Sequence, residues 1–231
     1  MKLNPKSRIS VTGGGTGTGI AAKINKTIDI AMASREMKDK EFKQAEKNGL
    51  KIKEVTIAFD AITIVLNKNN KMENLTLEQL RDIYLGKIVN WKELGGADKK
   101  IIVISRDSSS GTHLYFKEHV LRKGKSKGTE EFGKSILFLP SNEAIKQQVE
   151  SVDGSIAYLG LGYVDNKVKP IKINGIPANV KTVKDKTYPI ARSVYWYVDE
   201  NITGITKKLV DFMLSDRGQA IVEKEGFVPI K

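Results

Sequence analysis

Two loops rich in glycine and hydroxyl residues carry the groups best suited to chemistry. Residues 12–19 read TGGGTGTG and follow a β-branched run at 9–11, while residues 106–112 read RDSSSGT and follow a similar run at 101–104. Each loop leads into a segment with helical spacing, so its backbone N–H groups lie unpaired at the positive end of the helix dipole. Such a loop can bind an anion. Because Ser, Thr and Gly are also favoured at ordinary helix N-caps, either loop alone is open to both interpretations.

The two loops together, with Arg106 in the second, favour one oxyanion held from both sides. A dinucleotide-binding fingerprint needs glycines at offsets zero, two and five, but the third position is Thr18 when counted from Gly13 and Ile20 when counted from Gly15. No Gly-Lys-Ser/Thr follows either loop, so there is no Walker A lysine. The pattern therefore indicates a small free oxyanion rather than the phosphate chain of a nucleotide.

The composition is that of a folded protein with a real core, since 40% of the 231 residues are hydrophobic and 29% are charged. The net charge of +12 is spread along the chain, and the densest basic cluster, residues 122–127, is short and broken by a glycine. We therefore expect no nucleic-acid partner. The absence of cysteine excludes disulfides, Cys-based metal sites and a thiol nucleophile. His113 and His119 are six residues apart, on different faces of a helix, so no metal site is expected.

Strand and helix patterns alternate along the chain, which predicts an α/β protein with mainly parallel sheets. Residues 76–79 (TLEQ) form a capping box that begins a helix ended by Gly86. The expected strands are residues 9–11, 28–34, 55–66, 101–104, 136–139, 156–159 and 188–198. The expected helices are residues 20–26, 38–48, 76–86, 113–121, 142–150 and most of 202–224.

Six sequence blocks, spread over nearly the whole length, carry a family resemblance. They are TGGGTGTGI at 12–20, DIAMASRE at 29–36, LTLEQLRDIYLGKIVNWKELGG at 75–96, SRDSSSGTH at 105–113, GSIAYLGLGYV at 154–164 and YPIARSVYWYV at 188–198. In these blocks the chain closely resembles the phosphate-binding proteins of ABC transporters.

The resemblance implies a two-lobed fold of the periplasmic-binding-protein type (type II), each lobe a mainly parallel sheet flanked by helices. Phosphate would lie in the cleft, and the closed form would deliver it to the permease subunits of an ABC transporter. The chain would cross between lobes near Ala58 and near Ala191. Lobe one would comprise residues 1–58 and 192–231, and lobe two residues 59–191. The implied location is extracytoplasmic, with the targeting segment absent from these residues, since the first six residues lack a signal peptide's apolar core.

The family's phosphate-binding positions carry over onto both loops and onto the end of one strand. Without the resemblance, Ser34 could equally be a turn cap, and Arg106 a surface partner of Asp107. The implied phosphate-binding residues are Thr16, Gly17, Thr18, Ser34, Arg106, Ser110, Gly111 and Thr112.

The chain departs from the family pattern in two places. Arg35 stands where many members have an aspartate that accepts the phosphate's proton, so we count Arg35 with the phosphate site and expect weaker discrimination against sulfate. Only eight residues precede Ile9, whereas members normally start with one more strand and helix. We therefore expect lobe one to be covered by a second copy in a homodimer or to be repacked. If nothing replaces the donors of the missing unit, phosphate binding falls to the millimolar range.

The sequence therefore predicts a high-affinity phosphate receptor that needs no cofactor and is not an enzyme. No nucleophile lies beside a base, and no two carboxylates are placed for acid–base catalysis, so no catalytic residue is assigned. An enzyme acting on phosphate esters would need a metal site or an activated nucleophile. The remaining alternative is a degenerate binding-protein scaffold with weak anion binding and a sensing or interaction role. A titration with phosphate separates these three classes of function.

Overall fold

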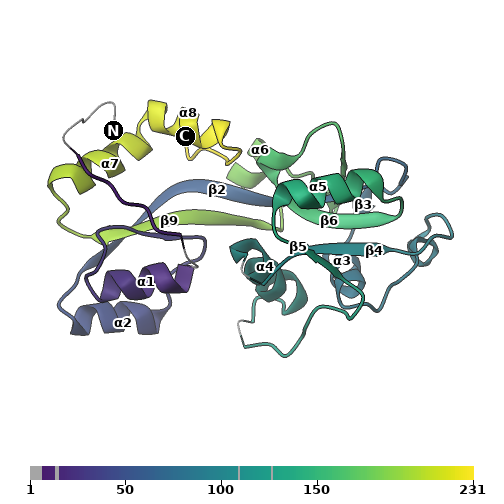
Figure 1. Cartoon of the computed structure of the whole chain (residues 1–231), viewed down its shortest axis with the longest axis horizontal. Coiled ribbons are helices and arrows are strands. Elements are labelled where there is room, and N and C mark those ends of the chain that lie inside the picture. The colour runs from purple at the N-terminus through teal and green to yellow at the C-terminus, as the bar shows by residue number, and fades with distance from the viewer. Residues whose placement is uncertain (1–6, 14–15, 109, 126) are drawn as a thin grey trace. The chain divides into compact units, whose positions relative to one another are not determined.

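The computed structural model describes residues 7–13, 16–108, 110–125 and 127–231 (Figure 1). Gly14 and Gly15 of the first loop, Ser109 of the second, and Ser126 of the basic cluster lie outside the described residues. The chain divides into two compact units. Unit 1 comprises Met1–Ala58, Ser193–Ile221 and Pro229–Lys231, and unit 2 comprises Phe59–Arg192 and Val222–Val228.

Unit 1 is built on a small sheet in which β9 lies between β1 and the first part of β2. β1 runs antiparallel to β9, with Met32 opposite Trp196. The two N-terminal helices lie side by side (Figure 1) and share a core with β1 that includes Ile20, Ala33 and Ala45. The elements of unit 1 are α1 (Thr16–Ile24), β1 (Ala31–Ala33), α2 (Asp39–Lys47), the start of β2 (Ile52–Leu66), most of β9 (Ala191–Asp199), α7 (Gly204–Leu214) and most of α8 (Asp216–Lys224).

Unit 2 contains a larger sheet with the strand order β2–β6–β4–β5, and β7 pairs with β2. A separate two-stranded sheet joins β3 to β8. The strands of unit 2, besides the end of β2, are β3 (Asn74–Leu75), β4 (Ile102–Arg106), β5 (Leu137–Leu139), β6 (Ser155–Gly160), β7 (Lys169–Pro170) and β8 (Lys172–Ile173). Its helices are α3 (Leu77–Tyr84), α4 (Gly111–Phe116), α5 (Asn142–Ser151) and α6 (Val180–Lys184), with short helical turns at Trp91–Leu94, Lys117–Leu121 and Leu161–Tyr163.

The α/β class expected from the sequence is confirmed, but the sheets are mixed rather than mainly parallel. β4 is parallel to both β5 and β6, whereas β6 is antiparallel to β2, with Ile64 opposite Tyr158. Strands β4, β5 and β6 follow one another with a helix between each pair, and such a crossover returns the chain in the same direction. The partners of β2 and β9 are distant in sequence, so the alternation of elements does not determine their direction.

The two faces of the larger sheet are covered by different helices. Ile64 of β2 and Tyr158 of β6 are fully buried in a cluster that includes Tyr84 of α3 and Phe116 of α4. Neighbouring residues along the same strands, among them Val65, pack instead in a cluster with α5. This alternation follows from the two-residue period of a strand, and burial on both faces explains why the end of β2 and most of β6 are apolar.

Several local predictions are confirmed and one is wrong. The Thr76 capping box forms as expected: the Gln79 N–H donates to Thr76 Oγ1 at 3.1 Å and the Thr76 N–H donates to Gln79 Oε1 at 2.8 Å. The helix expected at 113–121 begins at Gly111 and ends in a π-helical turn. Residues 9–11 form no strand, because no described strand pairs with them.

Candidate functional site

The first glycine loop leads directly into α1, which begins at Thr16. The Ser34 N–H donates to Thr16 Oγ1 at 3.1 Å, and the two hydroxyl oxygens are 3.4 Å apart. Gly17 and Thr18 lie in the first turn of the helix, where backbone N–H groups have no partner within the helix. Unit 1 therefore brings together four of the predicted site residues as two hydroxyls beside a helix N-terminus.

Arg35, next to this pair, is bonded to a carboxylate. Its guanidinium donates to both carboxylate oxygens of Glu41 at 2.9 Å and to the carbonyl of Glu36 at 2.7 Å. The bidentate bond from Arg35 lowers the pKa of the Glu41 carboxyl below its ordinary value, and the N–H of Lys38, the N-cap residue of α2, donates to the same carboxylate and lowers it further. The arrangement balances the charge of Arg35 with a neighbouring carboxylate. A direct contact between Arg35 and phosphate stays a prediction.

The second loop joins β4 to α4 in unit 2. Ser110 is the N-cap of α4, and its Oγ accepts from the N–H groups of Thr112 at 3.2 Å and His113 at 3.4 Å. Ser110 therefore acts as an ordinary helix N-cap, which is one of the two interpretations that the sequence left open for this loop. Capping uses the hydroxyl as an acceptor, so its proton stays available to an anion.

Arg106, the last residue of β4, makes hydrogen bonds through both its backbone carbonyl and its side chain. The backbone carbonyl of Arg106 lies 2.8 Å from His113 Nδ1, and its side chain donates to the Pro140 carbonyl at 3.0 Å and to Asn142 Oδ1 at 3.4 Å. The Nε–H is buried and has no hydrogen-bond partner among the described residues. Burial also lowers the pKa of the His113 imidazole. The Arg106 guanidinium thus retains one buried donor for a further acceptor.

Arg192, which the sequence analysis did not single out, contacts the second loop. Its Nε and Nη2 donate to Asp60 Oδ2 at 3.0 and 2.8 Å, and the two side chains are only 9% and 10% exposed. Arg192 also donates to the Gly111 carbonyl at 3.2 Å and to Thr112 Oγ1 at 3.1 Å. Its guanidinium carbon lies 5.0 Å from the ring centroid of Tyr115. One signal was available: Arg192 and Asp60 each interrupt an apolar run, and buried charges need partners.

Comparison with known proteins identifies the family. The profile of the PBP superfamily domain matches residues 1–217. The phosphate-binding protein PstS of Borreliella burgdorferi is 32% identical over 240 residues, which cover 100% of this chain and 82% of that protein. The chain belongs to the phosphate-binding proteins of ABC transporters.

Solved structures agree with this membership. A putative phosphate ABC transporter substrate-binding protein from Clostridium perfringens, solved with bound phosphate, is 38% identical with a TM-score of 0.81, and the match covers 100% of this chain and 90% of that one. An ABC-type phosphate transport receptor from Vibrio cholerae is 29% identical with a TM-score of 0.86, over 98% of this chain and 90% of that one. The two-lobed periplasmic-binding-protein fold expected from the sequence is therefore confirmed.

Within this phosphate-binding protein, every predicted site residue is among those described. Thr16, Gly17, Thr18 and Ser34 gather at the start of α1, and Arg106, Ser110, Gly111 and Thr112 at the start of α4. No helix in the described part of the chain is both long and apolar enough to cross a membrane.

The bond between Arg35 and Glu41 predicts a pH-dependent contribution to stability. The folded-state pKa of Glu41 is lowered from 4.5, so the stabilisation is complete above that value and is lost as the pH falls through the lower, folded-state pKa. Because the pair is partly exposed, we expect Glu41→Gln to reduce the free energy of unfolding by about 1 kcal/mol at neutral pH. Urea denaturation at pH 7 and pH 3 measures the change. Glu46→Gln, at an exposed position on the same helix, is the control, and an equal pH dependence of both variants contradicts the prediction.

Proposed function

We propose that the chain binds inorganic phosphate outside the cytoplasm and delivers it to the permease subunits of an ABC transporter. The observation that carries this proposal is the match to the Clostridium perfringens protein, whose structure holds bound phosphate. The two chains are 38% identical, and the match covers the whole of this chain. Relatives named for phosphate binding or phosphate transport point the same way.

Two sets of groups would contact the phosphate. In unit 1 we assign the hydroxyls of Thr16 and Ser34 and the N–H groups of Gly17 and Thr18. Hydroxyls beside a helix N-terminus can donate to the oxygens of an anion. We also count Arg35 with the phosphate site, where its guanidinium, bonded to Glu41, contributes positive charge beside Ser34.

In unit 2 the Arg106 guanidinium supplies the positive charge, and its planar fork suits a tetrahedral oxyanion. The unpartnered Nε–H of Arg106 supports this role, because a buried donor without an acceptor is costly until a ligand supplies one. The Ser110 hydroxyl and the N–H groups of Gly111 and Thr112 complete the set. Arg192 acts as a positioning residue, since it bonds to Gly111 and Thr112 from the protein side.

We propose binding without catalysis and without a cofactor. The assigned groups are hydrogen-bond donors and two arginine cations, which suit binding and include no nucleophile beside a base. We further propose that residues 1–58 and 192–231 act as lobe one and residues 59–191 as lobe two, with crossings near Ala58 and Ala191. The division of the chain between Ala58 and Phe59 and between Arg192 and Ser193 supports the two crossings, whereas Val222–Val228 group with unit 2 and not with the rest of lobe one.

Calorimetric titration with phosphate, arsenate and sulfate tests the function. We expect saturable binding of phosphate, recovered unchanged, and millimolar sulfate should compete with it. Sulfate carries no proton at neutral pH, so rejecting it requires an acceptor for the proton of phosphate, and Arg35 stands where the family often has that acceptor. Turnover of a phosphate ester would indicate an enzyme, and no binding at all would indicate a degenerate scaffold. Complete failure of sulfate to compete contradicts our interpretation of Arg35.

A further inference from the structure

Three buried side chains converge on the backbone of Arg106. The Arg106 N–H donates to the Tyr158 hydroxyl at 3.3 Å. The Arg106 carbonyl accepts from Ser105 Oγ at 3.1 Å and lies 2.8 Å from His113 Nδ1. Ser105 and Tyr158 are fully buried, and His113 is buried as well. Both polar groups of the Arg106 backbone are therefore bonded to side chains.

The pairing of β4 explains how the Tyr158 hydroxyl reaches this position. The pairing of β4 with β6 ends at Val103, opposite Ile156. Ser105 and Tyr158 lie two residues further along their strands, so their side chains are neighbours on the same face of the sheet. The Tyr158 ring extends beyond the paired part of β6 toward Arg106. Side chains thus take over where the backbone pairing of β4 with β6 stops.

The hydrogen bonds among Ser105, Arg106 and Tyr158 form a closed circuit. A carbonyl can only accept, so the Ser105 hydroxyl donates to the Arg106 carbonyl, and the Tyr158 hydroxyl donates to Ser105 Oγ at 2.7 Å. The Tyr158 oxygen in turn accepts from the Arg106 N–H. Each hydroxyl then donates once and accepts once. A buried network in which every group is satisfied is rigid, so the circuit restricts the Arg106 backbone to one position.

Packing fixes the Tyr158 ring itself. The ring stacks on Phe116 with centroids 4.2 Å apart, and the Tyr84 ring lies at 5.8 Å. Burial raises the pKa of the Tyr158 hydroxyl to about 12, although the hydrogen bonds with Ser105 and Arg106 oppose the rise. The hydroxyl therefore keeps its proton at neutral pH and remains a donor to Ser105.

We propose that Tyr158 is a positioning residue for phosphate binding, because its hydroxyl fixes the Arg106 backbone and thereby orients the guanidinium. The inference rests on the proposed function, in which Arg106 supplies the positive charge of unit 2. Arg106 is the last residue of β4, and a loop follows it. A cation that is fixed before binding loses less conformational entropy when the anion binds. Tyr158 needs no contact with phosphate to have this effect.

A matched pair of tyrosine variants tests the proposal. Tyr158→Phe keeps the ring and removes only the hydroxyl. Tyr188→Phe makes the same change at another buried tyrosine of unit 2, whose hydroxyl donates to the Ile62 carbonyl at 2.9 Å. We expect Tyr158→Phe to weaken phosphate binding by about three- to tenfold, the range that one neutral hydrogen bond spans. Tyr188→Phe should leave the phosphate affinity unchanged, although both variants lose a buried hydrogen bond.

Combination with Arg106→Ala separates positioning from general damage to the fold. If Tyr158 acts through the Arg106 guanidinium, Tyr158→Phe should cause no further loss of phosphate affinity once that guanidinium is gone. General damage would weaken binding by the same factor in both backgrounds. Isothermal titration calorimetry measures all four proteins. Ser105→Ala removes the other hydroxyl of the circuit with a smaller change in volume and should show the same pattern, so it replaces Tyr158→Phe if that variant does not fold.

Hydrogen–deuterium exchange, followed by NMR without phosphate, reports on the circuit directly. We expect the Arg106 amide to exchange faster in Tyr158→Phe and at the wild-type rate in Tyr188→Phe. An unchanged exchange rate at Arg106 in Tyr158→Phe would overturn the inference. Equal phosphate affinities of the two tyrosine variants, or an equal loss in the Arg106→Ala background, would overturn it too. Absence of phosphate binding by the wild-type chain would instead contradict the proposed function, so the two failures are distinguishable.

Discussion

Replacing Arg106 with alanine is expected to weaken phosphate binding by about tenfold to more than a hundredfold. Charge-assisted hydrogen bonds contribute about 1.5–3 kcal/mol each, and each 1.4 kcal/mol corresponds to about a factor of ten in affinity. The buried Nε–H of Arg106 has no acceptor among the described residues, so a bound anion can accept from it without displacing a protein contact. Isothermal titration calorimetry of both proteins with phosphate measures the change.

The control for this variant is Arg217→Ala, at an exposed position on α8. The chain carries a net charge of +12, and removing any one positive charge weakens the attraction of an anion slightly. Arg217→Ala measures this general effect, and Arg106→Ala should exceed it clearly. The fold of Arg106→Ala should remain nearly intact, which circular dichroism checks. Equal phosphate affinities for the two variants would show that Arg106 does not contact the phosphate.

The second large effect is expected for Arg192→Met, which should lower the free energy of unfolding by about 3–5 kcal/mol. Methionine keeps much of the length of the side chain but leaves the buried Asp60 carboxylate without its partner. Breaking a buried ion pair is costly because one uncompensated charge remains in a medium that solvates it poorly. Chemical denaturation measures the loss. We also expect weaker phosphate binding, since the bonds from Arg192 to Gly111 and Thr112 are lost as well.

The double variant Asp60→Asn, Arg192→Met separates pairing from packing. Removing both charges leaves no unpaired ion, so the double variant should be more stable than Arg192→Met alone. Additive losses from the two single variants would show that the ion pair contributes little. In that case the stability lost in Arg192→Met would come from packing, including the contact with the Tyr115 ring.

The sequence by itself determined those features that depend on neighbours along the chain. The Thr76 capping box needs only residues three apart, and its hydrogen bonds form as predicted. The glycine- and hydroxyl-rich loops also lead into α1 and α4 as expected, because a helix N-terminus is specified by its cap and first turn. Motifs of this local kind, together with the family blocks, were sufficient for the fold class and for the candidate phosphate residues.

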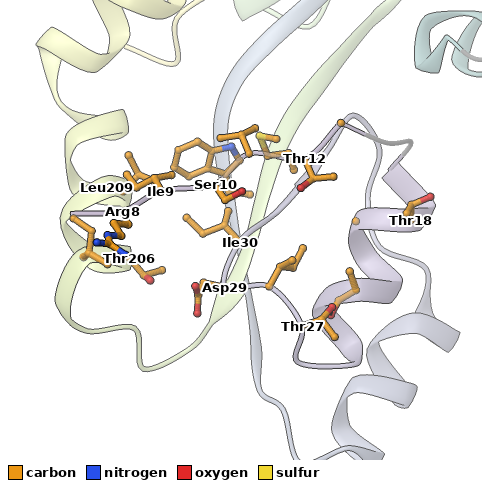
Figure 2. Close-up of a pocket in the computed structure, with 18 residues that line it drawn as sticks. Arg8, Ile9, Ser10, Thr12, Thr18, Thr27, Asp29, Ile30, Thr206 and Leu209 are labelled. Carbon is orange, nitrogen blue, oxygen red and sulfur yellow. The ribbon is translucent and has the colours of Figure 1, made fainter. Parts of the chain in front are cut away.

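Only the tertiary structure decided the features that depend on distant partners. Asp60 and Arg192 are 132 residues apart in sequence, so no local sequence pattern predicts that they form an ion pair. Residues 9–11 have strand composition but form no strand, since a strand requires a neighbouring edge and a groove of about 690 Å³ separates them from β1 (Figure 2). The directions of β2 and β9 likewise follow from packing. The strand propensity of a segment can be read from its sequence, whereas strand pairing depends on which segments folding brings together.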